Sequence, residues 1–350
     1  MKAFCYNVEY AILLLCSILK FLDGTFLPQI GNGFSAHGQL HVNNSNLIDE
    51  QGRITVLRGI SSHGITWYPQ YLNGGAMKTL REYGANLFRI AMYTEPTGAY
   101  LDDRERSMEY LYMGAESALS QDMYVIVDWH ILKDGDPNEF IEEAESFFYE
   151  VSAHYADEPG ILYEICNEPN GETTWEDIVR YAQRIIPVIR SNAPEAVVIV
   201  GTPHHCTDFT GPLEHPLDFE NIMYSLHRYI DISIEEPGDA GQLPALLEQG
   251  LPVFVSEWGV AMGEQDYLED EKADLSGNAY PERAQPFIDY MSEHNISWAG
   301  WALSNKEEWH SAVRSDCEKL SGWTEEDLTI SGRLMFRNFR AHVWRESSDG

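Results

Sequence analysis

Short apolar runs alternate with longer stretches of helical period from about residue 84 onward. This alternation is typical of parallel α/β folds, in which a helix follows each strand and covers the sheet. With one run further upstream, the chain has eight strand candidates, at residues 56–60, 86–92, 124–128, 161–165, 197–201, 222–226, 253–256 and 297–302.

Near-continuous apolar strands imply a sheet that is buried on both faces. Eight strand–helix units favour a (β/α)8 TIM barrel, with an open doubly wound sheet as the alternative. No Gly-x-Gly-x-x-Gly pattern follows the first strand, so a dinucleotide-binding sheet lacks its usual support. Residues 39–42 and 47–49 flank a turn and predict a short N-terminal β-hairpin that closes the barrel floor. We expect one barrel domain over residues 36–345.

The net charge is −33, from 23 Lys and Arg against 56 Asp and Glu. Nucleic acid and anionic membranes bind basic patches, so we expect neither as a partner. Aromatic residues make up 12% of the chain, which fits a protein that meets neutral polar ligands with ring faces. We expect the mature protein to be a monomer.

Residues 11–22 form an apolar run that is too short to span a bilayer. With Lys2 ahead of it and polar sequence behind it, the run resembles a secretory signal. We expect residues 1–28 to be a signal peptide or N-terminal extension of a secreted protein; the alternative is an extension of a cytosolic protein. Removing this segment leaves three cysteines, too few for a disulfide framework: Cys166, Cys206 and Cys317.

Polar side chains follow seven of the eight predicted strands, at the end where barrel enzymes build their sites. Each one alone has a structural explanation, such as a paired core arginine or a packed tryptophan. Gathered on one rim they would be costly to bury without a function, because buried charges must be matched. They include His63, Trp67, Tyr68, Arg89, Tyr93, His130, Asn167, Glu168, His227, Tyr229, Glu257 and Trp301.

Glu168 and Glu257 follow the fourth and seventh strands, on different sides of the expected barrel mouth. Glycosidases flank the scissile bond with two carboxyl groups, one protonated and one ionised. We expect Arg89 and Tyr229 to hold Glu257 as the carboxylate and to leave Glu168 with the raised pKa. Asn167 is expected to hydrogen-bond the sugar 2-hydroxyl.

Six motifs make the chain similar to the catalytic domain of glycoside hydrolase family 5 of clan A, close to its bacterial endo-β-1,4-glucanase branch. They are LRGISSHG at 57–64, FRIAMY at 88–93, VDWHIL at 127–132, YEICNEPNG at 163–171, VSEWG at 255–259 and WAGWAL at 298–303. The resemblance runs from about Gly38 to the last predicted helix. It implies a (β/α)8 barrel and a retaining double displacement without a cofactor or metal, with Glu168 as acid/base and Glu257 as nucleophile.

The resemblance also implies roles for the residues around this pair. Those that match the family's catalytic surround are Arg89, His130, Asn167, His227 and Tyr229. Those that match its glucose-binding positions are His63, Trp67, Trp301 and Lys306. We expect Tyr68, Tyr93 and His205 to bind substrate as well.

Two positions depart from the family pattern. Arg228 stands where relatives usually have an aromatic residue, and we expect it to point away from the site because strand neighbours alternate faces. His205 follows the fifth strand where relatives tend to present a tryptophan, so a stacking platform is expected to be weakened. If this loop is shifted, His204 or Phe209 takes that place. His204, His205 and Cys206 are adjacent and cannot easily all face one ion, so we expect no metal site there.

The sequence therefore predicts a secreted, retaining endo-β-1,4-glucanase that acts on cellulose and related β-glucans. Within the same class, the alternative is a mannanase or a mixed-linkage β-glucanase. From another class, it is a non-catalytic carbohydrate-binding barrel, although binding alone requires neither Glu168 nor Glu257.

Overall fold

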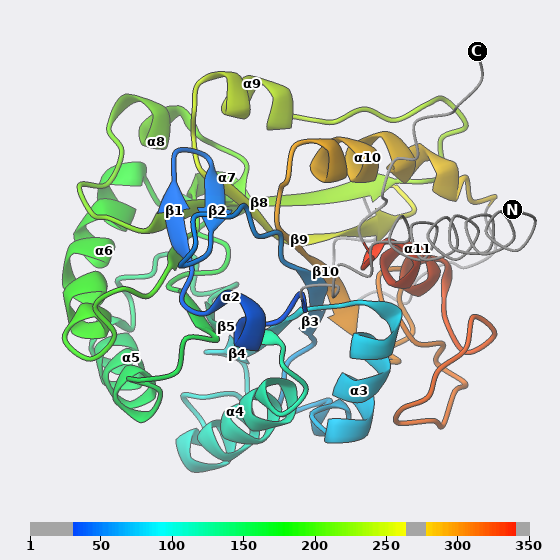
Figure 1. Cartoon of the computed structure of the whole chain (residues 1–350), viewed down its shortest axis with the longest axis horizontal. Coiled ribbons are helices and arrows are strands. Elements are labelled where there is room, and N and C mark those ends of the chain that lie inside the picture. The colour runs from blue at the N-terminus through cyan, green and yellow to red at the C-terminus, as the bar shows by residue number, and fades with distance from the viewer. Residues whose placement is uncertain (1–30, 264–277, 341–350) are drawn as a thin grey trace, which may run out of the picture. The chain divides into compact units, whose positions relative to one another are not determined.

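The computed structural model describes residues 31–263 and 278–340, and the described residues from Gly33 onward belong to one compact unit. Eight parallel strands close into a barrel in chain order, and the last strand pairs with the first (Figure 1). The barrel prediction is confirmed, and the open-sheet alternative is wrong. The strands are β3 (Arg58–Ser62), β4 (Leu87–Tyr93), β5 (Tyr124–His130), β6 (Ile161–Glu164), β7 (Val198–Val200), β8 (Ile222–Asp231), β9 (Val253–Ala261) and β10 (Trp298–Leu303).

Helices lie between the strands and around the barrel (Figure 1). They are α2 (Phe34–His37), α3 (Gly74–Tyr83), α4 (Arg104–Leu119), α5 (Ile141–His154), α6 (Trp175–Arg190), α7 (Pro203–Cys206), α8 (Thr210–Glu214), α9 (Leu243–Glu248), α10 (Gln285–Glu293) and α11 (Ile330–Asn338). Short 3-10 turns cover Pro69–Tyr71 and Pro281–Ala284.

Helix α6 shows how local sequence sets these elements. Its first turn is fixed by a capping box, in which the Thr174 side chain accepts from the Asp177 backbone and Asp177 accepts from the Thr174 backbone. Its apolar residues recur at helical spacing and are buried against the barrel: Ile178, Tyr181, Ala182, Ile185, Ile186 and Ile189.

The barrel interior is a packed core, and the N-terminal hairpin closes its lower end. Strands β1 (His41–Asn43) and β2 (Asn46–Ile48) pair antiparallel, and Leu40 and Leu47 pack against the inward-facing strand residues. Those inward-facing residues include Leu87, Tyr124, Ile126, Leu162, Ile199, Met223 and Phe254. The predicted floor hairpin is confirmed. Because the lower layers of the barrel interior are filled, the polar side chains at the strand ends meet at the other end.

Strand β9 carries an irregularity that shapes that end. Ser225 on β8 pairs with Phe254 on β9, and His227 pairs with Glu257. Over this stretch β9 therefore moves three residues along its length while β8 moves two. The same offset appears against β10. Such a bulge re-aims side chains. As a result, Ser256 and Glu257, although adjacent, both hydrogen-bond within the polar end of the barrel.

The predicted signal segment, residues 1–28, lies outside the described residues, so the domain limits remain a prediction. Within the described ranges, no helix is both long and apolar enough to cross a membrane.

Candidate active site

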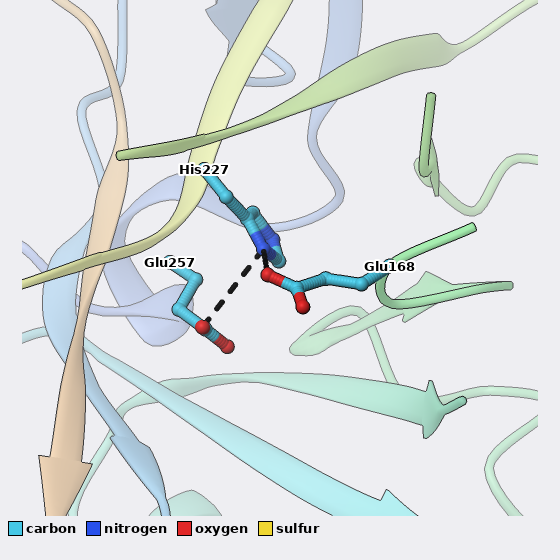
Figure 2. A group of neighbouring side chains, drawn as sticks. All are labelled: Glu168, His227 and Glu257. Atoms are coloured by element: carbon cyan, nitrogen blue, oxygen red, sulfur yellow. Dashed lines mark hydrogen bonds and ion pairs between the residues drawn. The ribbon is translucent and has the colours of Figure 1, made fainter. Parts of the chain in front are cut away.

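Glu168 and Glu257 face one another across the barrel mouth, with His227 between them (Figure 2). One oxygen of each carboxyl group and one ring nitrogen of His227 all lie within 4.8 Å of one another. His227 Nδ1 is 2.8 Å from Glu168 Oε1 and 3.9 Å from Glu257 Oε1. The loop after β6, strand β8 and strand β9 each supply one member, so this group exists only in the closed barrel.

Arg89 on β4 lies fully buried beneath the pair and contacts side chains of β3, β5, β6 and β9. Its Nη1 donates to Glu257 Oε2 at 3.1 Å, its Nε donates to Glu164 Oε2 at 2.7 Å, and its Nη2 donates to Asn167 Oδ1 at 2.6 Å. Asp128 lies 3.0 Å from the same Nη2. Burial lowers the pKa of Arg89, but these carboxylates raise it by more than burial lowers it. The net shift is upward, so the guanidinium stays charged.

The expected contacts of Glu257 are present, but the expected pKa order of the pair is wrong. Tyr229 donates to Glu257 Oε1 at 2.7 Å, and Arg89 holds the other oxygen. Burial and the nearby charge of Glu168 nevertheless raise the pKa of Glu257 above its ordinary value. Burial also raises the pKa of Glu168, but the hydrogen bond and charge of His227 lower it more, so its net shift is downward.

His227 explains this reversal. Burial lowers its pKa, but the carboxylates of Glu257, Glu164 and Glu168 raise it to about 10. These directions favour His227 over Glu168 as the holder of the proton that was expected on Glu168, across a hydrogen bond of 2.8 Å.

His130 and Asn167 form a second buried group beside Glu168. His130 Nδ1 lies 2.7 Å from Asp128 Oδ2, and Asn167 Nδ2 lies 3.3 Å from His130 Nε2. Burial and the charges of Arg89 and His227 lower the pKa of His130, so it donates through Nδ1 and accepts at Nε2. The Asn167 amide also donates to Ile131 O at 3.1 Å. A sugar 2-hydroxyl would compete with these partners for the Asn167 amide.

Aromatic side chains predicted to bind sugar meet on one side of the pair. Ring centroids lie 4.9 Å apart for Trp67 and Tyr93, 4.8 Å for His63 and Tyr68, and 5.4 Å for His63 and Trp301. A Cβ at Gly64 would lie 2.2 Å from the Trp67 ring, so glycine is what lets the indole lie against this turn. Trp67 is 36% exposed and presents apolar ring surface to solvent.

Lys306 is held beside this aromatic group by Glu308. Lys306 Nζ lies 2.8 Å from Glu308 Oε2, His310 Nε2 lies 3.3 Å from the same oxygen, and His63 Nε2 lies 3.9 Å from Oε1. Burial raises the pKa of Glu308, but these neighbours lower it well below its ordinary range. Glu308 therefore stays ionised and fixes the ammonium at the rim.

The loop after β7 places His205 near Glu168. His204, His205 and Cys206 adopt left-handed conformations with φ of 55°, 57° and 58°. The His205 backbone donates to Pro169 O at 3.0 Å, and His205 contributes to lowering the pKa of Glu168. Phe209 is buried in the core, so of the two shifted-loop alternatives it does not line the rim.

The other departure, Arg228, points away from the site as expected. Its guanidinium lies 4.9 Å from the Phe287 ring centroid on α10 and pairs with Asp239.

The described part of the chain offers one group of side chains close enough to be weighed as metal ligands, namely Glu168, His227 and Glu257. Their positions are accounted for by hydrogen bonds, since His227 Nδ1 is hydrogen-bonded to Glu168.

The three cysteines that the structure describes, Cys166, Cys206 and Cys317, form no disulfide bond. The Cys206 thiol is buried and donates to Asn167 O at 2.8 Å.

Sequence reasoning assigned no role to four residues that the site contains: Asp128, Glu164, Ser256 and Glu308. Strand alternation could have indicated Glu164, because it lies two residues after Leu162 and shares its inward face. Ser256 was hidden by the bulge, which breaks the alternation that a sequence pattern assumes.

Residues 48–307 match the profile of the family described as Cellulase (glycosyl hydrolase family 5). Endoglucanase A of Butyrivibrio fibrisolvens is 42% identical over 301 residues, covering 84% of this chain and 67% of that protein. An endoglucanase of Clostridium saccharobutylicum is 40% identical over 299 residues, covering 84% of this chain and 63% of that protein. The chain thus spans about two thirds of the length of these curated relatives.

The fold has solved counterparts as well. The catalytic domain of the endoglucanase Cel5A of Thermobifida fusca, crystallised in complex with cellotetraose, superposes with a TM-score of 0.77 at 29% identity. The match covers 87% of this chain and 98% of that domain.

Proposed function

Because the chain belongs to the cellulase family, glycosyl hydrolase family 5, and is a glycoside hydrolase, we propose that it cleaves internal β-1,4-glucosidic bonds with retention of anomeric configuration. The proposed substrates are cellulose and related β-glucans. Two of the relatives described above are named endoglucanases, and the Thermobifida domain binds cellotetraose.

The observation that carries the proposal is the spacing of Glu168 and Glu257. Their nearest oxygens lie within 4.8 Å. Retaining enzymes hold their carboxyl groups roughly 5–5.5 Å apart, whereas inverting enzymes need ~6.5–9.5 Å to fit a water molecule. A separation of this size supports the retaining arrangement over the inverting one.

In the proposed mechanism, Glu257 attacks the anomeric carbon and Glu168 protonates the departing oxygen. Tyr229 and Arg89 each hold one oxygen of Glu257 and so orient it for attack. Water then hydrolyses the glycosyl-enzyme as Glu168 accepts its proton. The aromatic group around Trp67 and Trp301 supports sugar rings by stacking.

A reducing-sugar assay on carboxymethyl-cellulose, mixed-linkage β-glucan and mannan in parallel tests the substrate. We expect the highest kcat/KM on β-1,4-glucan. Preference for mannan or mixed-linkage glucan would replace the proposed specificity, and binding without turnover on all three would favour the non-catalytic barrel.

We also propose that the enzyme is secreted and acts as a monomer. The support for secretion is the apolar run at residues 11–22 behind Lys2, together with a polysaccharide substrate too large to enter a cell. N-terminal sequencing of protein from culture medium tests cleavage near residue 28, and light scattering tests the monomer.

A further inference from the structure

A continuous chain of hydrogen bonds runs from a buried carboxylate below the site to the proposed acid. Glu164 ends β6 and is fully buried. Ser256 Oγ lies 2.7 Å from Glu164 Oε1, His227 Nε2 lies 3.1 Å from Ser256 Oγ, and His227 Nδ1 lies 2.8 Å from Glu168 Oε1. This chain of hydrogen bonds thus joins β6, β9 and β8 and ends on Glu168.

In each of these hydrogen bonds the chemistry fixes which atom donates. Glu164 is ionised, because Arg89 Nε donates to its Oε2 at 2.7 Å. An ionised carboxylate only accepts, so the single hydroxyl proton of Ser256 goes to Glu164. The Ser225 hydroxyl also contacts Ser256 Oγ, and it must therefore donate to it. Ser256 must then accept from His227 Nε2–H. This order places one proton on Nε2 whatever the state of Glu168.

The remaining nitrogen, Nδ1, faces Glu168 Oε1. With Nε2 already protonated, one more proton fits between Nδ1 and Oε1. It belongs either to an imidazolium beside a carboxylate or to a neutral imidazole beside a carboxylic acid. The His227–Glu168 unit therefore holds one transferable proton, as a general acid requires.

We propose that Glu164 is a positioning residue which, through Ser256, fixes the His227 tautomer and so keeps the transferable proton on the bond to Glu168. This inference rests on the proposed function, because it assigns that proton to the glycosidic oxygen. The electrostatics agree in direction: Glu164 helps to raise the pKa of His227, and Arg89 helps to lower the pKa of Glu164 to about 2 although burial raises it.

The proton balances over the two steps of a retaining reaction. In the first step, the glycosidic oxygen takes the proton from the Nδ1–Oε1 bond as its bond to the anomeric carbon breaks and Glu257 bonds to that carbon. His227 is then neutral, and its Nδ1 lone pair faces the Glu168 carboxylate. In the second step, water attacks, the bond to Glu257 breaks, and the released proton returns between Nδ1 and Oε1. No co-reactant besides water is needed.

Other titratable groups also face His227 and Glu164, so the test must separate their effects. Glu164 acts from the Nε2 side of the ring at 3.8 Å, whereas Glu168 and Glu257 lie on the Nδ1 side. The remaining groups are Arg89 from β4, Asp128 and His130 from β5, Cys166 after β6, and Cys206 from α7.

Glu164→Gln is the first test. Glutamine keeps the shape but removes the charge, and its amide can donate to Ser256 and reverse the chain. We expect the alkaline limb of the pH profile of kcat/KM to move to lower pH by about one unit, since His227 loses an anion that raises its pKa. At neutral pH, cellotetraose hydrolysis should fall by about 10²-fold.

The leaving group separates proton supply from other damage. A dinitrophenolate leaves without protonation, so hydrolysis of 2,4-dinitrophenyl β-cellobioside by Glu164→Gln should fall far less than that of cellotetraose. Equal losses on both substrates, or an unmoved alkaline limb, would show that Glu164 is only structural. The matched control is Asp49→Asn, which removes another buried carboxylate at the barrel floor and should leave both the limb and the leaving-group dependence unchanged.

Two further measurements keep the inference testable if Glu164→Gln does not fold. Ser256→Ala removes the hydroxyl that links Glu164 to His227 but keeps the Glu164–Arg89 pair. It should move the alkaline limb in the same direction. Nitrogen-15 NMR of the unsubstituted enzyme should show His227 Nε2 protonated from about pH 5 to about pH 9. An unprotonated Nε2 at neutral pH would overturn the proton chain. This NMR result does not depend on substrate, whereas failure of the unsubstituted enzyme to cleave cellotetraose would instead refute the proposed function.

Discussion

Glu168 and Glu257 approach within 4.8 Å of one another across the barrel mouth. This separation predicts a retaining reaction. Proton NMR of the first products of cellotetraose hydrolysis should show the β-anomer before mutarotation. Appearance of the α-anomer first would contradict the assignment.

Replacing Glu257 with alanine should abolish hydrolysis, because the anomeric carbon then lacks its nucleophile. Added azide should restore turnover of an activated aryl cellobioside and yield a glycosyl azide. Absence of both the azide product and any rescue would count against Glu257 as nucleophile.

Arg89 should matter through its charge on Glu257, which its Nη1 contacts at 3.1 Å. Arg89→Met removes a cation that lowers the pKa of Glu257, so that pKa rises and the acidic limb of kcat/KM should move to higher pH. Arg89→Lys keeps the charge and should hold the limb near its original position, although activity falls because the planar fork is lost.

Arg58→Met is the matched control for Arg89, because Arg58 is also a buried arginine on a barrel strand. The acidic limb of the pH profile of kcat/KM should not move in the Arg58→Met variant. If the acidic limb lay at the same pH in Arg89→Met as in Arg89→Lys, Arg89 would not act through its charge.

His205→Trp should lower KM on long cello-oligosaccharides by about 2- to 10-fold, because an indole offers more apolar stacking surface than an imidazole. Short chromogenic substrates that do not reach this side should keep their KM. His204→Trp, at the neighbouring position, which is exposed like His205, is the control and should change neither value. Equal KM values for His205→Trp and the unsubstituted enzyme on long substrates would mean that position 205 does not line the cleft.

Asp49 should stabilise the barrel floor in a pH-dependent way. It accepts from the Gln51 and Arg53 backbones, both at 2.9 Å, and lies 2.8 Å from His37 Nδ1. Burial raises its pKa, but these bonds lower it from 3.8 to about 2. Its contribution is therefore present above about pH 4 and is lost as the pH falls toward 2.

Asp49→Asn should lower the free energy of unfolding by about 1–3 kcal/mol near pH 7, measured by urea denaturation. The difference from the unsubstituted protein should shrink as the pH falls toward 2. Asp316→Asn, in an exposed pair with Arg314, should change stability by less than about 0.5 kcal/mol. A loss for Asp49→Asn that stays constant down to pH 2 would contradict the role of its charge.

Salt should stabilise this chain. A net charge of −33 repels itself, and added ions screen that repulsion. Tm should rise between low salt and about 0.5 M NaCl, by about 1.5 °C for each kcal/mol of repulsion that is screened. KCl should act equally, because screening does not distinguish the two cations. A Tm that falls steadily with either salt would refute this.

The sequence by itself determined the barrel, the floor hairpin and the identity of the two central carboxylates. Strand and helix periodicity are local properties, so the strand candidates at 86–92 and 124–128 lie within two residues of β4 and β5. Arg89, His227 and Glu257 were recognisable because charged or ionisable residues stand out at the ends of apolar strands.

Tertiary structure alone decided how these groups share protons. The pKa order of Glu168 and Glu257 depends on distances to His227 that span 59 and 30 residues of sequence, and on burial that no single strand reveals. The bulge in β9 turns Ser256 toward Glu164 and His227, and the left-handed turn at His204–Cys206 sets His205 beside Glu168. Both are departures from regular geometry, which periodicity cannot predict, and electrostatic coupling acts through space, where the closed barrel brings these side chains together.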